Sequence, residues 1–210
     1  MRGRFRPDNF AVRNAIGPLI VLACLSAAAC QAAPTGQIPA GWHTYSDARG
    51  FAISYPADWK ADPRFADLDY PDNDGNRAKI EGLGVTPTTE LQPGTTLQGK
   101  QVTLAVEVLP SFRPGCAAAN FLAQQPPDYN SGIDEQTQVY AHQSGGDPGG
   151  WYSYEDFVYL VSMKPCRAIH YFISYATPDG EPAQGVSPFD RKKLLKLLDR
   201  IRATFAPGHR

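Results

Sequence analysis

The sequence predicts an α+β fold, in which a mainly antiparallel β-sheet is flanked by helices and a C-terminal amphipathic helix packs on the sheet. Three observations lead to this prediction. Segments with apolar residues at every second position recur between residues 42 and 176. Short turn sequences join several of them, which favours antiparallel pairing. One stretch near the C-terminus repeats its apolar residues at spacings of three and four, as an amphipathic helix does.

The first 29 residues have the order of a secretory signal peptide. Four arginines precede an apolar run from Ala15 to Leu25, and small residues follow that run. A membrane-spanning helix needs about 20 apolar residues, which is roughly twice the length of this run, so we expect no transmembrane helix in the mature protein. We expect an exported, periplasmic protein.

Cys30 follows the small residues directly and is the candidate lipidation site, as in a bacterial lipoprotein signal. Lipidation there would anchor the protein to the outer membrane. Cys24 is a second candidate anchor, and simple cleavage of the signal after Ala29 would instead release a soluble protein.

The remaining chain divides into a tether, one domain and a tail. Residues 30–40 are small, polar and contain proline, so they are predicted to form a flexible tether. Residues 41–206 are predicted to form the domain, and residues 207–210 a tail. The formal net charge is −1 for the whole chain and about −4 without the arginine-rich first 29 residues, which argues against nucleic acid as a partner.

The first predicted strands form a hairpin over residues 42–55. Phe51, Ile53 and Tyr55 alternate with small residues and therefore share one sheet face. Pro56 is expected to end the second strand because it has no N–H to donate.

Further strands are predicted, in chain order, at residues 80–85, 102–109, 139–143, 151–163 and 166–176. The strand at 102–109 has the clearest alternation. The last two strands are joined by the short Lys164-Pro165 turn, so we expect them to be the central antiparallel pair. Turns and loops are predicted at residues 71–76, 87–99 and 145–150.

Two helices are predicted. Residues 116–125 are rich in Ala and poor in β-branched residues, and two prolines follow them. Ser187, Pro188 and Asp190 supply a cap, a first-turn proline and an acidic group for the second helix. Its apolar stripe comprises Leu194, Leu197, Leu198, Ile201 and Phe205.

The segment from Gly50 to Lys60 (Gly-Phe-Ala-Ile-Ser-Tyr-Pro-Ala-Asp-Trp-Lys) opens a domain that closes with an amphipathic helix. In this the chain resembles the PsbP-like α/β/α sandwich proteins, many of which are exported bacterial lipoproteins. The stretches at 80–85, 94–97, 106–109 and 116–122 look like uncharacterised proteobacterial members. The resemblance implies an antiparallel sheet with helices on its faces, and binding or assembly-support roles rather than catalysis. It assigns no functional residue.

Cys116 and Cys166 are the two cysteines of the predicted domain. An exported chain meets an oxidising compartment, in which such a pair usually forms a disulfide. The alternative makes Cys116 a nucleophile at a helix N-terminus, with His142 or His170 as its base. Because no orienting Asp or Asn is identifiable in the sequence, we favour the disulfide.

No metal or cofactor site is predicted. Residues 70–81 match an EF-hand loop at four positions, which are occupied by Asp72, Asp74, Gly75 and Glu81. Tyr70 stands where the first carboxylate is needed, so an acidic turn is the better interpretation. The histidines lack metal-ligand spacing, and His170 is expected to be a hydrogen-bonded core or surface residue. The glycine-rich residues 145–150 precede a strand rather than the helix that a phosphate site uses.

The sequence contains neither a Gly-x-Ser-x-Gly elbow nor a zinc-protease His-Glu motif. Aromatic residues are dense in the central strands and are candidates for a ligand or glycan face: Trp151, Tyr152, Tyr154, Phe157, Tyr159, Tyr171, Phe172 and Tyr175. Aromatics that alternate along strands more often divide between core and surface. We predict a non-catalytic cell-envelope accessory or binding lipoprotein, with an envelope protein or a small ligand as its partner. The alternatives are a thiol-dependent enzyme that uses Cys116 and a soluble periplasmic module that binds a small ligand.

Overall fold

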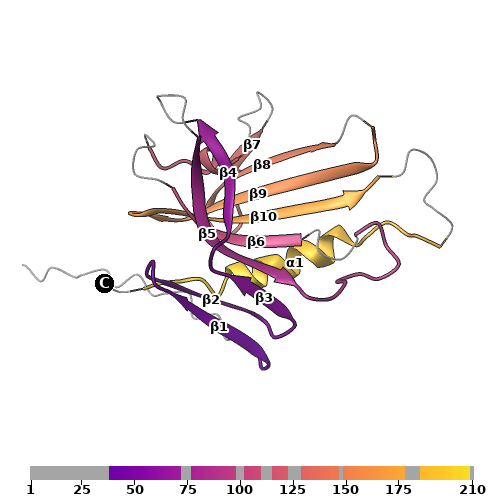
Figure 1. The fold of residues 1–210 in the computed structure, drawn as a ribbon, viewed down its shortest axis with the longest axis horizontal. Coiled ribbons are helices and arrows are strands. Elements are labelled where there is room, and N and C mark those ends of the chain that lie inside the picture. Colours follow the sequence, from indigo (N-terminus) through magenta and orange to yellow (C-terminus); the bar gives the residue numbers. More distant parts are fainter. Residues whose placement is uncertain are drawn as a thin grey trace, which may run out of the picture. The chain divides into compact units, whose positions relative to one another are not determined.

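Two antiparallel sheets and a C-terminal helix make up the computed structural model, which describes residues 38–71, 77–97, 102–109, 115–122, 129–146, 149–177 and 185–208 (Figure 1). The small sheet has the order β1-β2-β11, with β1 Trp42–Asp47, β2 Phe51–Pro56 and β11 Ala206–Pro207. The large sheet has the order β3-β5-β6-β10-β9-β8-β7, and β4 also pairs with β5. Its strands are β3 Trp59–Asp62, β4 Ala66–Pro71, β5 Arg77–Pro87, β6 Val102–Val108, β7 Asn130–Ile133, β8 Val139–Gly146, β9 Tyr152–Met163 and β10 Cys166–Ala176.

The predicted mainly antiparallel sheet is confirmed, since each named strand pair is antiparallel. Helix is scarcer than predicted. The described residues contain α1, Arg191–Arg202, and one 3-10 turn, η1, Ala118–Phe121. All of these elements fall within one compact unit, residues 32–210.

The first hairpin forms as predicted, with β1 and β2 in a register that pairs Tyr45 with Ile53. The Asp47 carboxylate accepts the backbone N–H of Arg49 at 2.8 Å, and Gly50 has a φ of 79°, which a residue with a side chain rarely adopts. Strand β2 ends at Pro56, as the missing N–H requires.

The last residues of the domain close on this hairpin. Thr204 Oγ1 accepts the N–H of Ser54 at 2.8 Å and lies 3.0 Å from the Ser54 carbonyl oxygen, to which it can donate. Strand β11 then pairs Ala206 with Ala52. Two segments separated by about 150 positions in the sequence therefore form one small sheet.

Strands β9 and β10 lie at the centre of the large sheet, as predicted, and β10 pairs with β6 on its other side. Four strands were not predicted: β3, β4, β7 and the two-residue β11. Strands β3 and β7 have only four residues each, too few to show a periodic pattern in the sequence.

The two faces of the large sheet bury separate apolar clusters. We call the side that packs on α1 and β2 the helix face, and the opposite side the η1 face. The helix-face cluster contains Phe51, Ile53, Tyr55, Trp59, Leu83, Val85, Leu97, Val102, Leu104, Val106, Phe157, Ile169, Tyr171, Ile173, Leu194, Leu198, Ile201 and Phe205. The η1-face cluster contains Ile80, Leu109, Ala118, Phe121, Leu122, Ala141, Val158 and Ala168. Because both faces are covered, the second alternating set of β6, which includes Glu107, is also buried.

Helix α1 begins later than predicted. Its N-cap is Asp190, whose carboxylate accepts the N–H of Lys193 at 2.9 Å. Ser187, the predicted cap, instead pairs with Thr95 in a β-bridge and accepts the N–H of Thr96. Phe205 lies beyond the end of the helix but is buried in the helix-face core, as its place in the apolar stripe suggested.

The helix predicted at residues 116–125 is wrong for the residues that the structure describes. Only Ala118–Phe121 are helical, in a 3-10 turn, and the flanking Ala117 and Leu122 are extended. No side chain caps the first turn, and both Phe121 and Leu122 are fully buried, which an extended exit from the turn permits.

No helix in the described part of the chain has both the length and the apolar character required to cross a membrane. The signal sequence, Cys24, Cys30 and most of the tether lie outside the described residues, as do the tip of the EF-hand-like loop and His209.

Candidate functional site

The structure brings Cys116 and Cys166 together in a disulfide, with an S–S distance of 2.07 Å and Cα atoms 5.6 Å apart. Cys166 is the first residue of β10, and Cys116 precedes η1 by two positions. The bond therefore ties η1 to the central strands. It also removes the thiol that the Cys116 nucleophile hypothesis requires.

The two histidines that were candidates for a catalytic base lie on opposite faces of the large sheet. The His142 ring stacks on Phe157, a member of the helix-face core, with centroids 4.2 Å apart. His170 is fully buried on the η1 face. It is a hydrogen-bonded core histidine, one of the two environments expected from the sequence.

Four buried polar side chains cross the η1 face from strand to strand, and we call them the polar row: Glu107, His170, Asp156 and Gln143. The Nδ1 atom of His170 lies 3.1 Å from Oε2 of Glu107. On the other side of the ring, Nε2 lies 4.0 Å from Oδ1 of Asp156. Gln143 donates its amide N–H to Oδ2 of Asp156 at 2.7 Å.

Burial raises the pKa of both carboxyl groups in the polar row. Glu107 has no exposed surface, and its pKa is raised well above the ordinary value by burial and then by the nearby charge of Asp156. Burial also raises the pKa of Asp156, although His170 and the Gln143 hydrogen bond oppose this. Since Glu107 and His170 are fully buried, the row is a core network in this structure rather than an open catalytic site.

On the helix face, an ion pair of Arg191 attaches the start of α1 to β9. Its guanidinium donates to both carboxylate oxygens of Glu155, at 2.6 to 2.9 Å. The same group lies over the ring of Phe157, with Cζ 5.4 Å from the centroid.

Arg202 attaches the end of α1 to the turn between β7 and β8. It donates to Asp134 at 2.7 Å, to Asp199 at 3.1 Å and to Gln138. Its Cζ lies 3.8 Å from the ring centroid of Tyr159, whose pKa burial raises to about 12, so the ring stays uncharged. We call these two contacts the arginine clamps.

A cavity of about 450 Å³ opens beside the clamps, between β7, β8 and β9. Its lining residues are Asn130, Ile133, Asp134, Glu135, Tyr140, His142, Phe157 and Tyr159. We call it the aromatic pocket. Phe157 is buried and Tyr140, His142 and Tyr159 are half-buried, so ring surfaces dominate its inner part. The Asn130 amide and the carboxylates of Asp134 and Glu135 supply its polar groups.

Charges in the aromatic pocket follow from the contacts of its side chains. Burial would raise the pKa of Asp134, but the hydrogen bonds from Arg202 and from backbone N–H groups outweigh it and lower the pKa. Burial lowers the pKa of His142, and nearby Glu155, 3.6 Å from Nε2, opposes this only in part. The pocket therefore holds ionised carboxylate and a neutral imidazole near pH 7.

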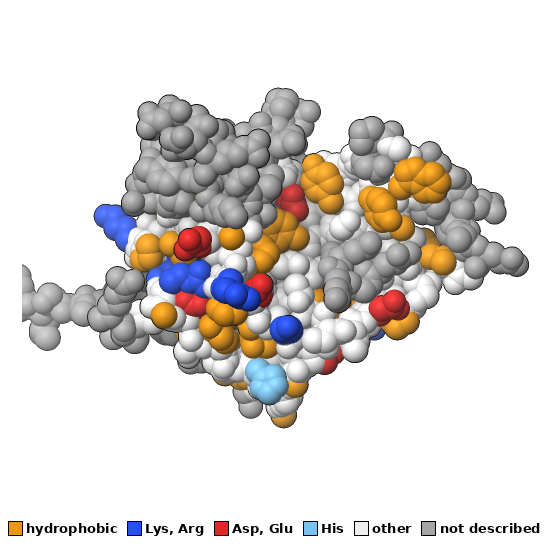
Figure 2. Space-filling model, in the orientation of Figure 1, with side chains coloured by type: hydrophobic (Ala, Val, Ile, Leu, Met, Phe, Trp, Pro, Cys, Tyr) orange, Lys and Arg blue, Asp and Glu red, His pale blue; other side chains and the backbone are white. Residues whose placement is uncertain are grey.

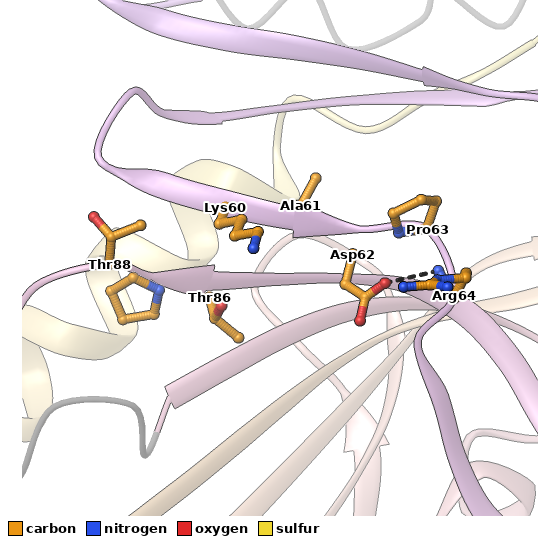
Figure 3. A pocket seen from close by; sticks show the side chains of 8 residues that line it. Lys60, Ala61, Asp62, Pro63, Arg64, Thr86 and Thr88 are labelled. Carbon is orange, nitrogen blue, oxygen red and sulfur yellow. Dashed lines mark hydrogen bonds between the residues drawn. The ribbon is translucent and has the colours of Figure 1, made fainter.

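Two other hollows lie elsewhere on the surface. One, of about 680 Å³, lies along β3 and β5 (Figure 3) and is lined by Lys60, Ala61, Asp62, Pro63, Arg64, Thr86, Pro87 and Thr88. Most of these residues are exposed, and Asp62 accepts the backbone N–H of Arg64 at 2.9 Å. The other lies on the outer side of α1 and is lined partly by Lys192, Lys196 and Arg200. Neither has the buried ring that forms the inner part of the aromatic pocket.

The aromatic set singled out in the sequence divides between core and surface. Tyr171 and Phe157 are buried on the helix face, whereas Trp151, Tyr152 and Tyr154 are 65%, 51% and 39% exposed. These three residues lie where β9 begins. Figure 2 shows exposed hydrophobic side chains on the same side of the view as the β8–β9 turn in Figure 1. They form a second surface that a partner can contact.

Sequence reasoning did not identify Glu107, Asp156 or the arginine clamps as interacting groups. One signal was present for Arg202, which follows Leu194 and Leu198 at spacings of four and so belongs to the buried stripe of α1. No local signal identifies the partners of Glu107, because His170 lies 63 positions away in the sequence.

In comparisons with known proteins, no family model, no curated protein and no solved structure matches this chain. The PsbP-like resemblance therefore stays a prediction from the sequence.

Proposed function

We propose that this chain is a non-catalytic binding protein of the bacterial cell envelope, which holds a ligand in the aromatic pocket. The observation that carries the proposal is the pocket itself, a cavity of about 450 Å³ with aromatic inner walls and a few polar groups at its rim. Concave sites of this composition are the usual form of small-molecule sites. The arginine clamps hold its walls in place, because they fix β9 and the β7–β8 turn to α1.

The rival function, a thiol-dependent enzyme, receives less support. Its nucleophile would be Cys116, whose sulfur is bonded to Cys166. A disulfide of this kind suits a protein that works in an oxidising compartment. Export, attachment of lipid at Cys30 and a PsbP-like ancestry belong to the proposal and rest on the sequence.

The first experiment tests export and the cysteines together, by a non-reducing peptide map of protein isolated from its native envelope. The proposal expects an acylated Cys30 and a Cys116–Cys166 peptide. A free Cys116 that reacts with an alkylating agent would contradict it and return the thiol enzyme to first place. An N-terminus beginning after Ala29 without lipid would replace the anchored form by the soluble periplasmic one.

The second experiment tests the pocket. The domain would be screened by thermal shift against amines, sugars, amino acids, nucleotides and fatty acids, because a bound ligand raises the melting temperature. The proposal expects at least one class to stabilise the wild type and not the Tyr140→Ala variant. Tyr152→Ala is the matched control, since it removes a tyrosine from outside the pocket. Stabilisation that depends on Tyr152 instead would move the site to the exposed aromatic surface.

A further inference from the structure

We infer that the aromatic pocket selects an organic ammonium cation over neutral and anionic ligands. The inference rests on the proposed function and names its ligand class. The lining combines three π-rings with the carboxylates of Asp134 and Glu135, and it contains no Lys or Arg side chain. Aromatic faces and carboxylates both attract positive charge, so the two features act in the same direction.

The rings of this pocket already bind cations that belong to the protein. Arg202 lies over Tyr159 and Arg191 lies near the face of Phe157. These contacts occupy ring surface on the side of α1. Tyr140 is half-buried and its ring lies beside Gly132, where an added Cβ would approach Cε1 to 3.2 Å. Among the described contacts no cation is stacked on Tyr140, whose ring centroid lies 6.2 Å from that of Tyr159, so the remaining surface of the Tyr140 ring can contact a ligand.

The charge balance around the pocket is negative. The two arginines are paired, Arg191 with Glu155 and Arg202 with Asp134 and Asp199. Glu135 is exposed at the rim and forms no ion pair with any described residue. Both oxygens of Asp134 are already hydrogen-bonded, Oδ2 to Arg202 and Oδ1 to the backbone N–H groups of Gln136 and Gln138. A ligand cation can therefore approach the Glu135 carboxylate without displacing a clamp.

The cationic side chains of α1 do not reverse this balance. Lys192, Lys196 and Arg200 line the hollow on the outer side of the helix, which Arg191, Asp199 and Gln136 also line, and none of the three lines the aromatic pocket. Since burial keeps His142 neutral near pH 7, the imidazole adds no positive charge to the pocket. An anion would meet unfavourable carboxylates at the rim, and a neutral ligand would gain nothing from them.

The test compares choline with its uncharged isostere, 3,3-dimethylbutan-1-ol, by calorimetric titration and thermal shift on the full mature domain. The two probes have the same shape, so a difference reports the charge. The inference expects choline to bind with an affinity that falls as salt rises, and the isostere to bind at least about tenfold more weakly, in line with a cation–π and carboxylate contribution near 1.4 kcal/mol.

Two variants assign that difference to the pocket. Tyr140→Leu and Glu135→Gln are each expected to weaken choline binding by about three- to tenfold. Glu81→Gln is the matched control, because Glu81 is an exposed carboxylate of β5 outside the pocket. A blocked lysine peptide tests the second source of the same chemistry: tighter binding of the peptide than of choline assigns the cation to a side chain of a partner protein.

The outcomes separate the inference from the proposed function. Equal binding of choline and its isostere would overturn the cation preference. If neither binds, but a compound of another class stabilises the wild type and not Tyr140→Ala, the inference fails and the proposed function stands. If no compound depends on Tyr140, both fail.

Discussion

Glu107 carries an ionisable carboxyl group into a fully buried position of the large sheet. Its Oε2 contacts His170, while its Oε1 has no hydrogen-bond partner among the described residues. Burial favours the protonated form, which is why its pKa is raised. A carboxyl group with a raised pKa stabilises the fold below its ordinary pKa, and this contribution is lost as the pH rises through the folded-state value.

Replacing Glu107 with Gln should therefore change how stability depends on pH. Gln is uncharged at every pH, so we expect the melting temperatures of Glu107→Gln and wild type to be close in mild acid. They should separate as the pH rises, with the variant more stable by about 1–3 kcal/mol at the alkaline end. Thermal unfolding between pH 4 and 10 measures this. Parallel curves, or the same divergence in the exposed control Glu81→Gln, would show that the buried charge is not the cause.

The polar row contains a residue, Glu107, whose burial and partners cannot be predicted from the local sequence. The alternation in residues 102–109 predicts a strand and identifies its helix-face residues, Leu104 among them, from local pattern alone. Burial of Glu107 depends on η1 and on strands more than 40 positions away. Its environment follows from tertiary packing, which the local pattern does not contain.

At the scale of elements, the arginine clamps attach α1 to the sheet with unequal strength. The Arg202 side chain is 3% exposed and that of Arg191 is 49% exposed. Arg202→Met should lower the free energy of unfolding by about 3 kcal/mol, because it leaves Asp134 without its charged partner beside the half-buried ring of Tyr159. Arg191→Met should cost less than about 1 kcal/mol, since water screens an exposed ion pair. Urea denaturation measures both, with Lys192→Met as the control, since Lys192 is exposed on the same helix.

The disulfide attaches η1 to β10, and its removal has a separate expected cost. It closes a loop with a sequence separation of 50 residues, for which the chain-entropy model gives at most about 4 kcal/mol. The Cys116→Ala, Cys166→Ala double variant should unfold at lower denaturant concentration than the oxidised wild type. Adding a reductant should shift the wild type and leave the variant unchanged. A reductant effect on the variant would point to a cause other than this bond.

The sequence predicts the position of some elements correctly and that of others incorrectly. The β1–β2 hairpin is readable because a local turn and a local alternation specify it. The start of α1 is misread because both Ser187 and Asp190 suit a cap, and only the bridge of Ser187 to Thr95 decides between them. The aromatic pocket combines residues of three strands with a clamp from α1, so no single segment of the sequence predicts it.

For the whole molecule, the helix-face core requires both ends of the domain. Leu194, Leu198 and Ile201 of α1 pack in the same cluster as Ile53 of β2. A chain that ends at Asp190 loses these residues and exposes the helix face, so it should lose cooperative unfolding and bind a hydrophobic dye. A chain that ends at Gly208 is the control and should melt like the wild type. Calorimetry distinguishes the two, and a cooperative transition in the shorter chain would contradict this account.

The hydrogen bonds between Thr204 and Ser54 mean that the small sheet can be completed only after the end of the domain has been synthesised. The first hairpin leaves the ribosome about 150 residues before its closing partner exists. Until then the helix-face core lacks Leu194, Leu198, Ile201 and Phe205, so the growing polypeptide has no complete core. If the chain is exported in an unfolded state, as proposed above, this arrangement delays folding during export, because the last residues of the chain complete the fold.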